Sequence, residues 1–207
     1  TDRALPPEVA AIQEPLGNAV HTVFAGDITG KTVAVIGCGP IGLFSIAICR
    51  IAGARAIFAT DVNPYRLELA RDLGADQVLN AAEVDVAAEI LAETKGHGVD
   101  VMLEMSGNPG AIREGFRVLR SGGRASLLGI PSRPVELDLT NDIIFKGAVV
   151  QGIFGRRMYE TWHLTSSLLA SGLDVSRVIT HVLPMDRYTE AMELMGSGNC
   201  GKVILKP

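Results

Sequence analysis

Six short apolar runs alternate with segments of helical pattern along most of this chain. The runs are almost continuously hydrophobic, which is typical of strands that helices cover on both faces. Their alternation with helices over short connections predicts an α/β fold, a doubly wound parallel sheet with six strands in the order 3-2-1-4-5-6. The predicted strands are 32–37, 56–61, 77–80, 99–105, 124–130 and 148–154, and the predicted helices between them are 40–52, 64–73, 84–94 and 108–119, with a short turn near 140–145.

The two ends of the chain depart from this alternation. A helix is predicted over 8–24, before the first strand, and Pro15 inside it should bend the helix and free a carbonyl group. Two more helices, 159–171 and 186–195, and a short strand, 202–205, are predicted after the last strand of the sheet. These flanking helices are expected to act as connectors or to form part of a second layer.

The amino-acid composition limits the classes of protein to which this chain can belong. Hydrophobic residues make up 47% of the 207, which provides for a sizeable core and excludes a disordered chain. The 19 Lys and Arg against 23 Asp and Glu argue against nucleic acid and anionic membranes as partners, since both favour a basic face. The apolar stretch before Arg50 is far shorter than the roughly 18 residues of a membrane span. Cys38, Cys49 and Cys200 are widely spaced, which predicts reduced thiols in a cytoplasmic protein.

A glycine-rich turn follows the first predicted strand. Gly37-Cys38-Gly39-Pro40-Ile41-Gly42 fits the pattern G-x-G-x-x-G at a junction of strand and helix, the context that gives this pattern its meaning. Gly37 permits a sharp turn, Gly39 lets a ligand approach the backbone, and Gly42 lets the helix pack closely on the sheet. The free N–H groups at the helix N-terminus favour an anion. The turn therefore predicts a dinucleotide site of the Rossmann type.

An acidic residue closes the second predicted strand. Asp61 lies 24 residues after Gly37, a spacing at which a carboxylate hydrogen-bonds the ribose hydroxyls of adenosine and repels a 2′-phosphate. The predicted cofactor is therefore NAD rather than NADP. Arg66, in the next helix, leaves two interpretations open, because it would either receive a 2′-phosphate or contact adenine and the ribose edge.

The later strands end in segments that meet the same edge of the predicted sheet. In a doubly wound sheet, a ligand binds beyond the carboxyl ends of the strands. Ser106-Gly107 ends the fourth strand and Leu128-Gly129-Ile130-Pro131 ends the fifth, where a nicotinamide or a ribose would pass. Ile153 and Phe154 end the sixth strand, and they either back a nicotinamide ring or are buried in the core.

Further segments extend over the whole chain: QEPLGNAVH at 13–21, VIGCGPIG at 35–42, ATDVNPYRLELARDLGAD at 59–76, EMSGNPGA at 104–111, GGRASLLGIP at 122–131, IFKG at 144–147, GIFGRRMYETW at 152–162 and GKVIL at 201–205. In this order they resemble the zinc-dependent medium-chain dehydrogenases. The first and the seventh are similar to those members that oxidise the 3-hydroxyl of L-threonine to 2-amino-3-oxobutanoate with NAD. The resemblance thus implies an NAD-dependent oxidoreductase of threonine catabolism with a small-molecule substrate.

The resemblance also implies roles for individual residues. The implied NAD contacts are Ile41, Asp61, Arg66, Leu128, Gly129, Ile130, Ile153 and Phe154. Glu14 matches an acidic position beside the catalytic zinc of the family, where it assists as a ligand or a proton relay. On the residues alone, Glu14, Asn18 and His21 form a polar stripe along one helix face, for which a solvated surface is the alternative.

The family carries its zinc ligands in a catalytic lobe that precedes the segments found here. The three cysteines and four histidines of this chain offer no compact ligand set, so no metal site is predicted in it, and zinc is expected only in longer relatives. The chain is therefore expected to be the cofactor-binding portion and to be inactive by itself. The predicted division is a leading helix at the edge of the catalytic lobe (1–29), a dinucleotide-binding domain (30–158) and a helical segment returning to that lobe (159–207).

Two other functions stay open at this point, a polyol or secondary-alcohol dehydrogenase and a stand-alone NAD-binding module without catalysis. A homo-oligomer is also predicted, formed through strand 148–154. In the predicted order this strand is an edge, and an apolar edge strand is a template for pairing with a second chain. Dimerisation through this strand is also what the family resemblance implies.

Overall fold

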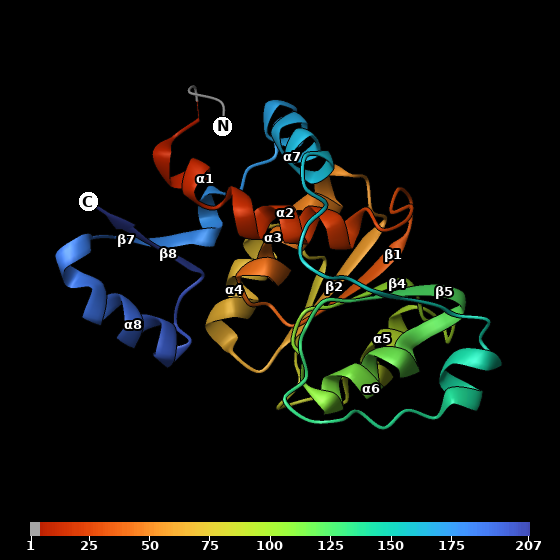
Figure 1. Cartoon of the computed structure of the whole chain (residues 1–207). Coiled ribbons are helices and arrows are strands. Elements are labelled where there is room, and N and C mark those ends of the chain that lie inside the picture. The colour runs from red at the N-terminus through yellow and green to blue at the C-terminus, as the bar shows by residue number, and fades with distance from the viewer. Residues whose placement is uncertain (1–4) are drawn as a thin grey trace.

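The strands form one six-stranded parallel sheet with the predicted order, β3-β2-β1-β4-β5-β6 (Figure 1). The structure, a computed structural model, describes residues 5–207. The strands are β1 (Thr32–Ile36), β2 (Ala56–Asp61), β3 (Gln77–Asn80), β4 (Val99–Glu104), β5 (Leu119–Leu127) and β6 (Val149–Gly152). Val33 of β1 pairs with Ile57 of β2 on one side and with Val101 of β4 on the other. The strand order therefore reverses between β1 and β4, which is where doubly wound sheets bind ligands.

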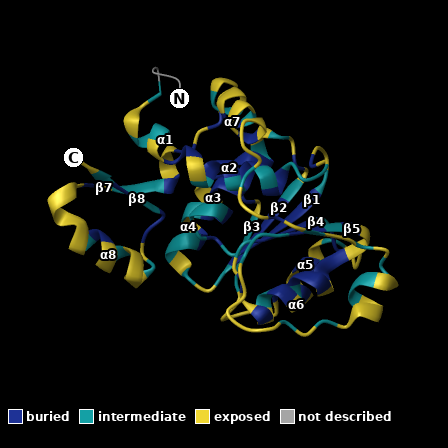
Figure 2. Cartoon of the chain, in the orientation of Figure 1, coloured by how far each residue is buried: buried dark blue, intermediate teal, exposed yellow. Residues whose placement is uncertain are grey.

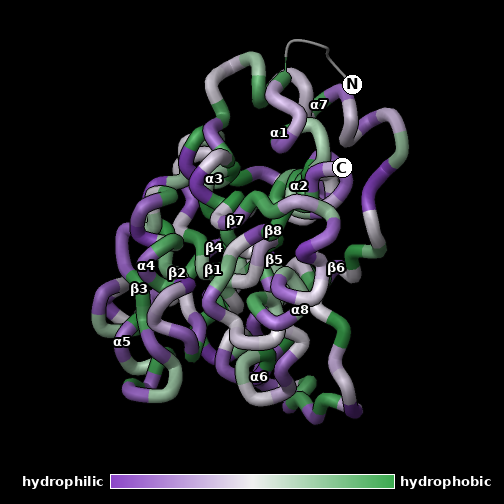
Figure 3. The backbone as a smooth tube through the Cα atoms, turned by 90° about the vertical axis from the view of Figure 1, so that its left-hand side faces the viewer, coloured by the Kyte–Doolittle hydropathy of each residue, from purple (hydrophilic) through white to green (hydrophobic). Residues whose placement is uncertain are grey.

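Helices cover both faces of this sheet. Alternate residues of β1 enter two separate cores, since successive side chains of a strand point to opposite faces. Val33 and Val35 pack with α3 (Pro40–Ile51) and α4 (Pro64–Asp72). Ala34 and Ile36 pack with α5 (Val86–Glu93) and α6 (Pro109–Val118). The central strands are accordingly buried along their length (Figure 2), and hydrophobic colouring follows them through the middle of the molecule (Figure 3).

Two of these helices begin with the same local signal, an asparagine followed by a proline. Asn63 accepts a hydrogen bond from the backbone N–H of Tyr65 at 2.9 Å, and Asn108 accepts one from that of Gly110 at 2.8 Å. The following proline occupies the first helical position, where its missing N–H would have no partner in any case. Each cap contributes about 1 kcal/mol. The dipeptide therefore sets where both helices leave the carboxyl edge of the sheet.

The leading segment consists of two helices rather than the single bent helix predicted over 8–24, so that prediction is wrong. Helix α1 (Pro7–Ala11) ends at Ile12, and α2 (Gln13–Val23) begins directly after it. With the break there, Pro15 falls in the first turn of α2, where it removes no intrahelical hydrogen bond. Helix α2 packs against α3 and against α7 (Glu160–Ala170) on one face of the sheet (Figure 1).

The C-terminal segment contains a strand that the sequence analysis missed. Strand β7 (Ile179–Pro184) pairs in parallel with β8 (Lys202–Lys206), and α8 (Tyr188–Ser197) connects them. Two short 3₁₀ turns, η2 (Ser176–Val178) and η3 (Met185–Arg187), flank β7. This layer lies at one side of the main sheet, and α8 is largely exposed (Figure 2).

Strands β5 and β6 end earlier than predicted. The expected strands 124–130 and 148–154 both extend past the sheet, since β5 ends at Leu127 and β6 at Gly152. A one-turn helix, η1 (Leu139–Ile144), stands where a turn was expected. The last residues of both expected strands, 128–130 and 153–154, consequently lie at the carboxyl edge, where Leu128 and Ile153 still donate backbone hydrogen bonds to the carbonyl oxygens of Glu104 and Leu127.

Candidate functional site

The turn between β1 and α3 is shaped by contacts that only glycine allows. Gly37 has a φ of 96°, a value that L side chains rarely adopt, and its N–H donates to the carbonyl oxygen of Thr60 at 2.8 Å. A Cβ on Gly37 would lie 2.9 Å from the side chain of Ser106. A Cβ on Gly42 would overlap the carbonyl oxygen of Gly37, so the first turn of α3 rests directly on the loop. The fold itself requires both glycines.

Gly39 differs from these two because the space in front of it is open. Its φ of −64° suits any residue, and a Cβ there would meet no atom of the described chain within 4 Å. It is the N-cap of α3, where the N–H groups of Ile41 and Gly42 lack intrahelical partners. Open backbone at the positive end of a helix dipole fits an anion such as a pyrophosphate.

Backbone N–H groups hold the Asp61 carboxylate from two sides. Its Oδ2 accepts from the N–H of Cys38 at 2.7 Å, and its Oδ1 accepts from the N–H of Asn63 at 2.9 Å. A carboxylate oxygen accepts more than one hydrogen bond, so capacity remains for a ligand hydroxyl. Burial raises the pKa of the neighbouring Cys38 thiol, and the Asp61 charge adds to the effect, so Cys38 is a packing residue rather than a nucleophile.

A cleft of about 610 Å³ opens at the carboxyl ends of β1, β2 and β4. Two predicted cofactor residues, Gly37 and Asp61, line it together with Ser106. Arg113 and Arg117 of α6 also line it, and the sequence analysis did not identify them. Their spacing of four residues, which places both on one helix face, is a signal that could have found them. The cleft has the size of a small-ligand pocket.

The C-terminal layer reaches the neighbourhood of Arg66. The Nε of Arg66 is buried without a partner among the described residues. One terminal nitrogen of its guanidinium lies 3.8 Å from the position that a Cβ on Gly198 would take. Asn63 donates from Nδ2 to the carbonyl oxygen of Gly198 at 3.1 Å. The loop after α8 therefore lies against the start of α4, a contact that no sequence pattern indicated, and both interpretations of Arg66 stay open.

The ends of β4 and β5 form another closely packed part of the same edge. Gly107 has a φ of 64°, and a Cβ there would lie 2.6 Å from the carbonyl oxygen of Ile130. The N–H groups of Leu128 and Gly129 both donate to the carbonyl oxygen of Glu104, at 3.0 and 3.1 Å. The structure thus brings the predicted 128–130 segment against the end of β4.

The side chains predicted to meet a nicotinamide differ in exposure. Ile130 is 88% exposed and Phe154 is 95% exposed, whereas Ile153 is only 7% exposed. Exposed apolar side chains beside a site are available to a ligand or to another chain. Of the two alternatives considered for the end of the sixth strand, burial therefore applies to Ile153, and Phe154 is free to contact a partner.

The polar stripe predicted on α2 is present, but its members have different surroundings. Glu14 is exposed, and Asn18 is half-buried with an Oδ1 that has no partner in the described part of the chain. His21 donates from Nδ1 to the carbonyl oxygen of Gly155 at 2.8 Å, which joins α2 to the segment after β6. Glu14 is not among the residues that line the cleft.

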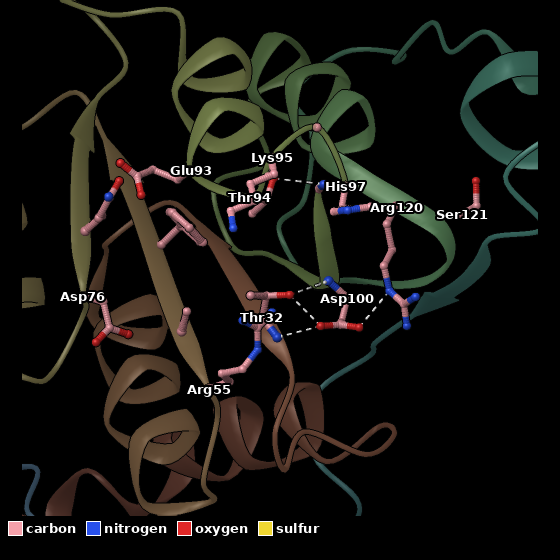
Figure 4. Close-up of a pocket in the computed structure, with 15 residues that line it drawn as sticks. Thr32, Arg55, Asp76, Glu93, Thr94, Lys95, His97, Asp100, Arg120 and Ser121 are labelled. Carbon is pink, nitrogen blue, oxygen red and sulfur yellow. Dashed lines mark hydrogen bonds and ion pairs between the residues drawn. The ribbon is translucent and has the colours of Figure 1, made fainter.

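A larger cavity, of about 830 Å³, lies at the opposite, amino edge of the sheet (Figure 4). Asp100 accepts there from the N–H of Thr32 at 2.7 Å and from its hydroxyl at 2.5 Å, and pairs with Arg120 at 2.7 Å. Burial alone would raise the pKa of Asp100, but these hydrogen bonds and the Arg120 charge outweigh it and lower the pKa. The covering helices end at this edge, so their dipoles disfavour an anion there.

Residues 5–207 contain no group of three His, Cys, Asp or Glu side chains placed to hold a metal ion. The three cysteines are free and buried. None of the helices in this part of the chain has both the length and the apolar character needed to cross a membrane.

The sheet order, the glycine turn and the cleft at the switch point define an α/β protein of the Rossmann class. Residues 40–171 match the family model for zinc-binding dehydrogenases, and the chain belongs to this family. The resemblance found in the sequence is thereby confirmed.

Two relatives and one solved structure illustrate the similarity. The chain is 53% identical over 208 residues to an L-threonine 3-dehydrogenase from Caldanaerobacter subterraneus subsp. tengcongensis, a match that covers all of this chain and 60% of that protein. It is 48% identical to one from Bacillus subtilis, over 97% of this chain and 58% of that protein. The crystal structure of an alcohol dehydrogenase from Thermotoga maritima superposes with a TM-score of 0.90 at 33% identity, over all of this chain and 59% of that one. The chain thus spans about three-fifths of the length of these relatives.

Proposed function

We propose that this chain supplies the NAD site of an enzyme that oxidises the 3-hydroxyl of L-threonine to 2-amino-3-oxobutanoate. The observation that carries the proposal is the open backbone at Gly39, at the N-terminus of α3 and between two glycines that the fold requires. The choice of L-threonine comes from the relatives, whose name is L-threonine 3-dehydrogenase. NAD, when bound, supplies the acceptor for a hydride.

The glycine turn would bind the pyrophosphate. Gly37 and Gly42 hold the loop against the sheet, and Gly39 leaves room for the ligand in front of the helix N-terminus. The unpaired N–H groups of Ile41 and Gly42 would donate to phosphate oxygens. Because these groups are already oriented, binding costs little ordering of the chain.

The cleft beside Asp61 would hold the adenosine. The remaining acceptor capacity of its carboxylate would bind the ribose hydroxyls, and its charge would repel the 2′-phosphate of NADP. Arg66, one turn into α4, would contact the adenine or the ribose edge. Arg113 and Arg117 also line the cleft, where their charges offset those of Asp61 and Glu114.

The edge beyond β4, β5 and β6 would receive the nicotinamide half. The backbone of Leu128 and Gly129 is anchored on Glu104, and Ile130 and Phe154 expose apolar side chains that a ring would cover. Ile153 would contribute through its backbone, since its side chain is buried. Removing such apolar surface from water stabilises the bound ring by about 25 cal/mol per Å².

Glu14 would be the catalytic residue that this chain contributes. Its exposed carboxylate, in the first turn of α2, is free to exchange a proton with a substrate hydroxyl. The described residues do not fit a zinc ion, because they provide no group of three ligands, and a single carboxylate does not hold the metal. The 207-residue chain is therefore expected to bind NAD and to turn over little threonine by itself.

Three further parts of the proposal concern the whole protein. We place it in the cytoplasm, which the three free thiols favour. We also propose that the chain divides into 1–29, 30–158 and 159–207, with the first and last segments directed toward a catalytic lobe. We also propose a homo-oligomer through β6, because this edge strand exposes Val149 and Val150.

Binding and activity measurements test the proposal and separate its alternatives. Calorimetric titration of the chain should give a lower Kd for NAD than for NADP. Asp61→Ala should lower the affinity for NAD about tenfold and reduce the difference between the Kd values for NAD and NADP. Glu93→Ala, which removes a charge of the same sign at the amino edge, is the matched control. Equal affinity of the unchanged chain for both cofactors would contradict the assignment.

Substrate assays of the full-length protein separate the three functions. NADH formation that depends on threonine supports the proposal, and Glu14→Gln should then change its pH profile. NADH formation with polyols but not with threonine would favour a secondary-alcohol dehydrogenase. NAD binding without turnover of either class would favour a binding module.

A further inference from the structure

Glu104, the last residue of β4, is a fully buried carboxylate at the carboxyl edge of the sheet. Its Oε1 accepts three hydrogen bonds: from the N–H of Ser106 at 2.8 Å, from the Ser106 hydroxyl at 2.5 Å and from the N–H of Gly107 at 2.9 Å. Its Oε2 is equally buried and has no partner among residues 5–207. Burying a carboxylate with an unpaired oxygen is costly, so its presence needs an explanation.

The same residue also holds the neighbouring strand. The carbonyl oxygen of Glu104 accepts from the N–H groups of Leu128 and Gly129, directly after β5. A Cβ on Gly129 would overlap both the Oε2 of Glu104 and the N–H of Gly107, so the three residues meet where only glycine fits. Glu104 therefore contacts both segments that end at the nicotinamide side of the proposed site.

The other end of β4 provides a comparison. Asp100 also binds a backbone N–H and a hydroxyl, both from Thr32, but its second oxygen is paired with Arg120. At the amino edge, Asp100 therefore anchors β4 while both of its carboxylate oxygens have partners. The unpaired oxygen of Glu104 adds nothing to stability, since a well-packed apolar side chain avoids that cost.

We propose that Glu104 is a positioning residue for the nicotinamide half of the NAD site. Its carboxylate holds the turn at Ser106 and Gly107 through three hydrogen bonds, and Gly107 packs closely against Ile130, whose side chain is directed outward into solvent. A segment ordered before binding loses less freedom when the ligand arrives, so affinity rises without any direct contact from Glu104. This inference rests on the proposed NAD site and adds a residue that lies outside the glycine motif.

The test compares two ligands on the 207-residue chain by calorimetric titration. NAD fills the whole proposed site, whereas AMP fills only its adenosine end. Glu104→Leu removes the carboxylate acceptors and keeps a similar side-chain volume. This variant should lower the affinity for NAD about 10- to 100-fold and the affinity for AMP by less than about threefold. Glu104→Gln keeps an acceptor oxygen, and it should leave both affinities within about threefold of those of the unchanged chain.

Asp100→Leu is the matched control, because it removes a comparable anchor from the other end of β4. It should leave the ratio of NAD to AMP affinity unchanged even where it lowers the melting temperature. Equal weakening of NAD and AMP by Glu104→Leu would overturn the inference, and so would unchanged binding of both. If the unchanged chain binds no NAD, both the proposed function and this inference are contradicted. If the unchanged chain binds NAD but Glu104→Leu weakens NAD and AMP to the same degree, only this inference is contradicted.

Ser106→Ala keeps the test decisive if Glu104→Leu does not fold. This variant removes the hydroxyl that donates to Oε1 and leaves the carboxylate in place. NAD should bind about three- to tenfold more weakly, and AMP should be weakened by a smaller factor than NAD, since Ser106 also lines the cleft proposed for adenosine. Unchanged NAD affinity in Ser106→Ala would then count against the role of Glu104.

Discussion

The two edges of the six-stranded sheet carry similar carboxylate anchors in opposite surroundings. At the carboxyl edge, Glu104 lies beside the glycine turn and the N-termini of α3 and α6. At the amino edge, Asp100 lies in the larger cavity, 830 Å³ against 610 Å³, where the helices end. Chain direction rather than cavity volume thus decides which edge suits an anionic ligand, because it orients the helix dipoles.

The C-terminus of α6, which lies toward the amino edge, carries a cation that complements the negative end of the helix dipole. Lys146 donates from Nζ to the carbonyl oxygens of Phe116 at 2.5 Å and Leu119 at 2.6 Å, and so caps the C-terminus of this helix with a cation. Burial lowers the pKa of Lys146, yet its charge still complements the negative end of the dipole. The N-terminus of α6, by contrast, faces the cleft through Asn108. The C-terminus of the helix therefore meets the charge that its dipole favours, and its N-terminus is left facing the cleft.

Gly42→Ala should have the largest effect, because it breaks the carboxyl edge itself. The added Cβ would overlap the carbonyl oxygen of Gly37, so the turn or the helix must move. We expect a loss of about 3 kcal/mol in the free energy of unfolding, measured with denaturant, and no detectable NAD binding. Gly196→Ala, where a Cβ meets nothing within 4 Å, should stabilise the chain by about 0.5 kcal/mol. Similar unfolding curves for the two variants would contradict the close packing at Gly42.

Gly39→Ala should separate binding from folding at the same edge. The backbone conformation of Gly39 suits alanine and the space in front of it is open, so the free energy of unfolding should change by less than about 0.5 kcal/mol. The methyl group would occupy the path of the pyrophosphate, and NAD affinity should fall about 10- to 100-fold in a titration. NAD affinity equal to that of the unchanged chain would mean that the cofactor does not approach this turn.

Asp100→Asn tests the amino edge through pH. The pKa of Asp100 is lowered in the folded chain, so its contribution is complete above the unfolded pKa of about 3.9 and disappears as pH falls through the lower folded value. The variant should be less stable by about 1 kcal/mol at pH 7. This deficit should shrink below about pH 4, as thermal melts across pH would show. A stability deficit that grows toward low pH would contradict a lowered pKa of Asp100 in the folded chain. A changed NAD affinity would contradict the assignment of the ligand to the carboxyl edge alone.

Lys95→Gly should have the smallest effect, again at the amino edge. Lys95 follows α5 with a φ of 53°, and its N–H donates to the carbonyl oxygen of Ala92 in a helix-ending turn that favours glycine. Relief of this conformation should raise the free energy of unfolding by about 0.5 kcal/mol, with no change in NAD affinity. Lys95→Ala, which keeps the strain, should give no such gain in the same denaturation experiment.

Much of the carboxyl edge was predictable because its signals are local. The apolar runs predicted all six strands of the main sheet and their order, and the Asn-Pro pairs mark the starts of α4 and α6. The glycine spacing identified Gly37 and Gly42; the structure explains Gly42 by a contact within the same turn and Gly37 by its positive φ and its contact with Ser106. Strand β7 was missed because half-exposed residues such as Val182 give a weak hydrophobic pattern.

The sequence by itself indicated the strands, the glycine turn and the acidic residue that ends β2, since each has a pattern that is recognisable within a few positions of the chain. Only the tertiary structure decided the rest. It placed Gly198 against Asn63, His21 against Gly155 and the buried carboxylate of Glu104 against Gly129. These contacts join residues far apart in the chain, and whether a polar atom is paired when buried depends on such neighbours rather than on sequence spacing.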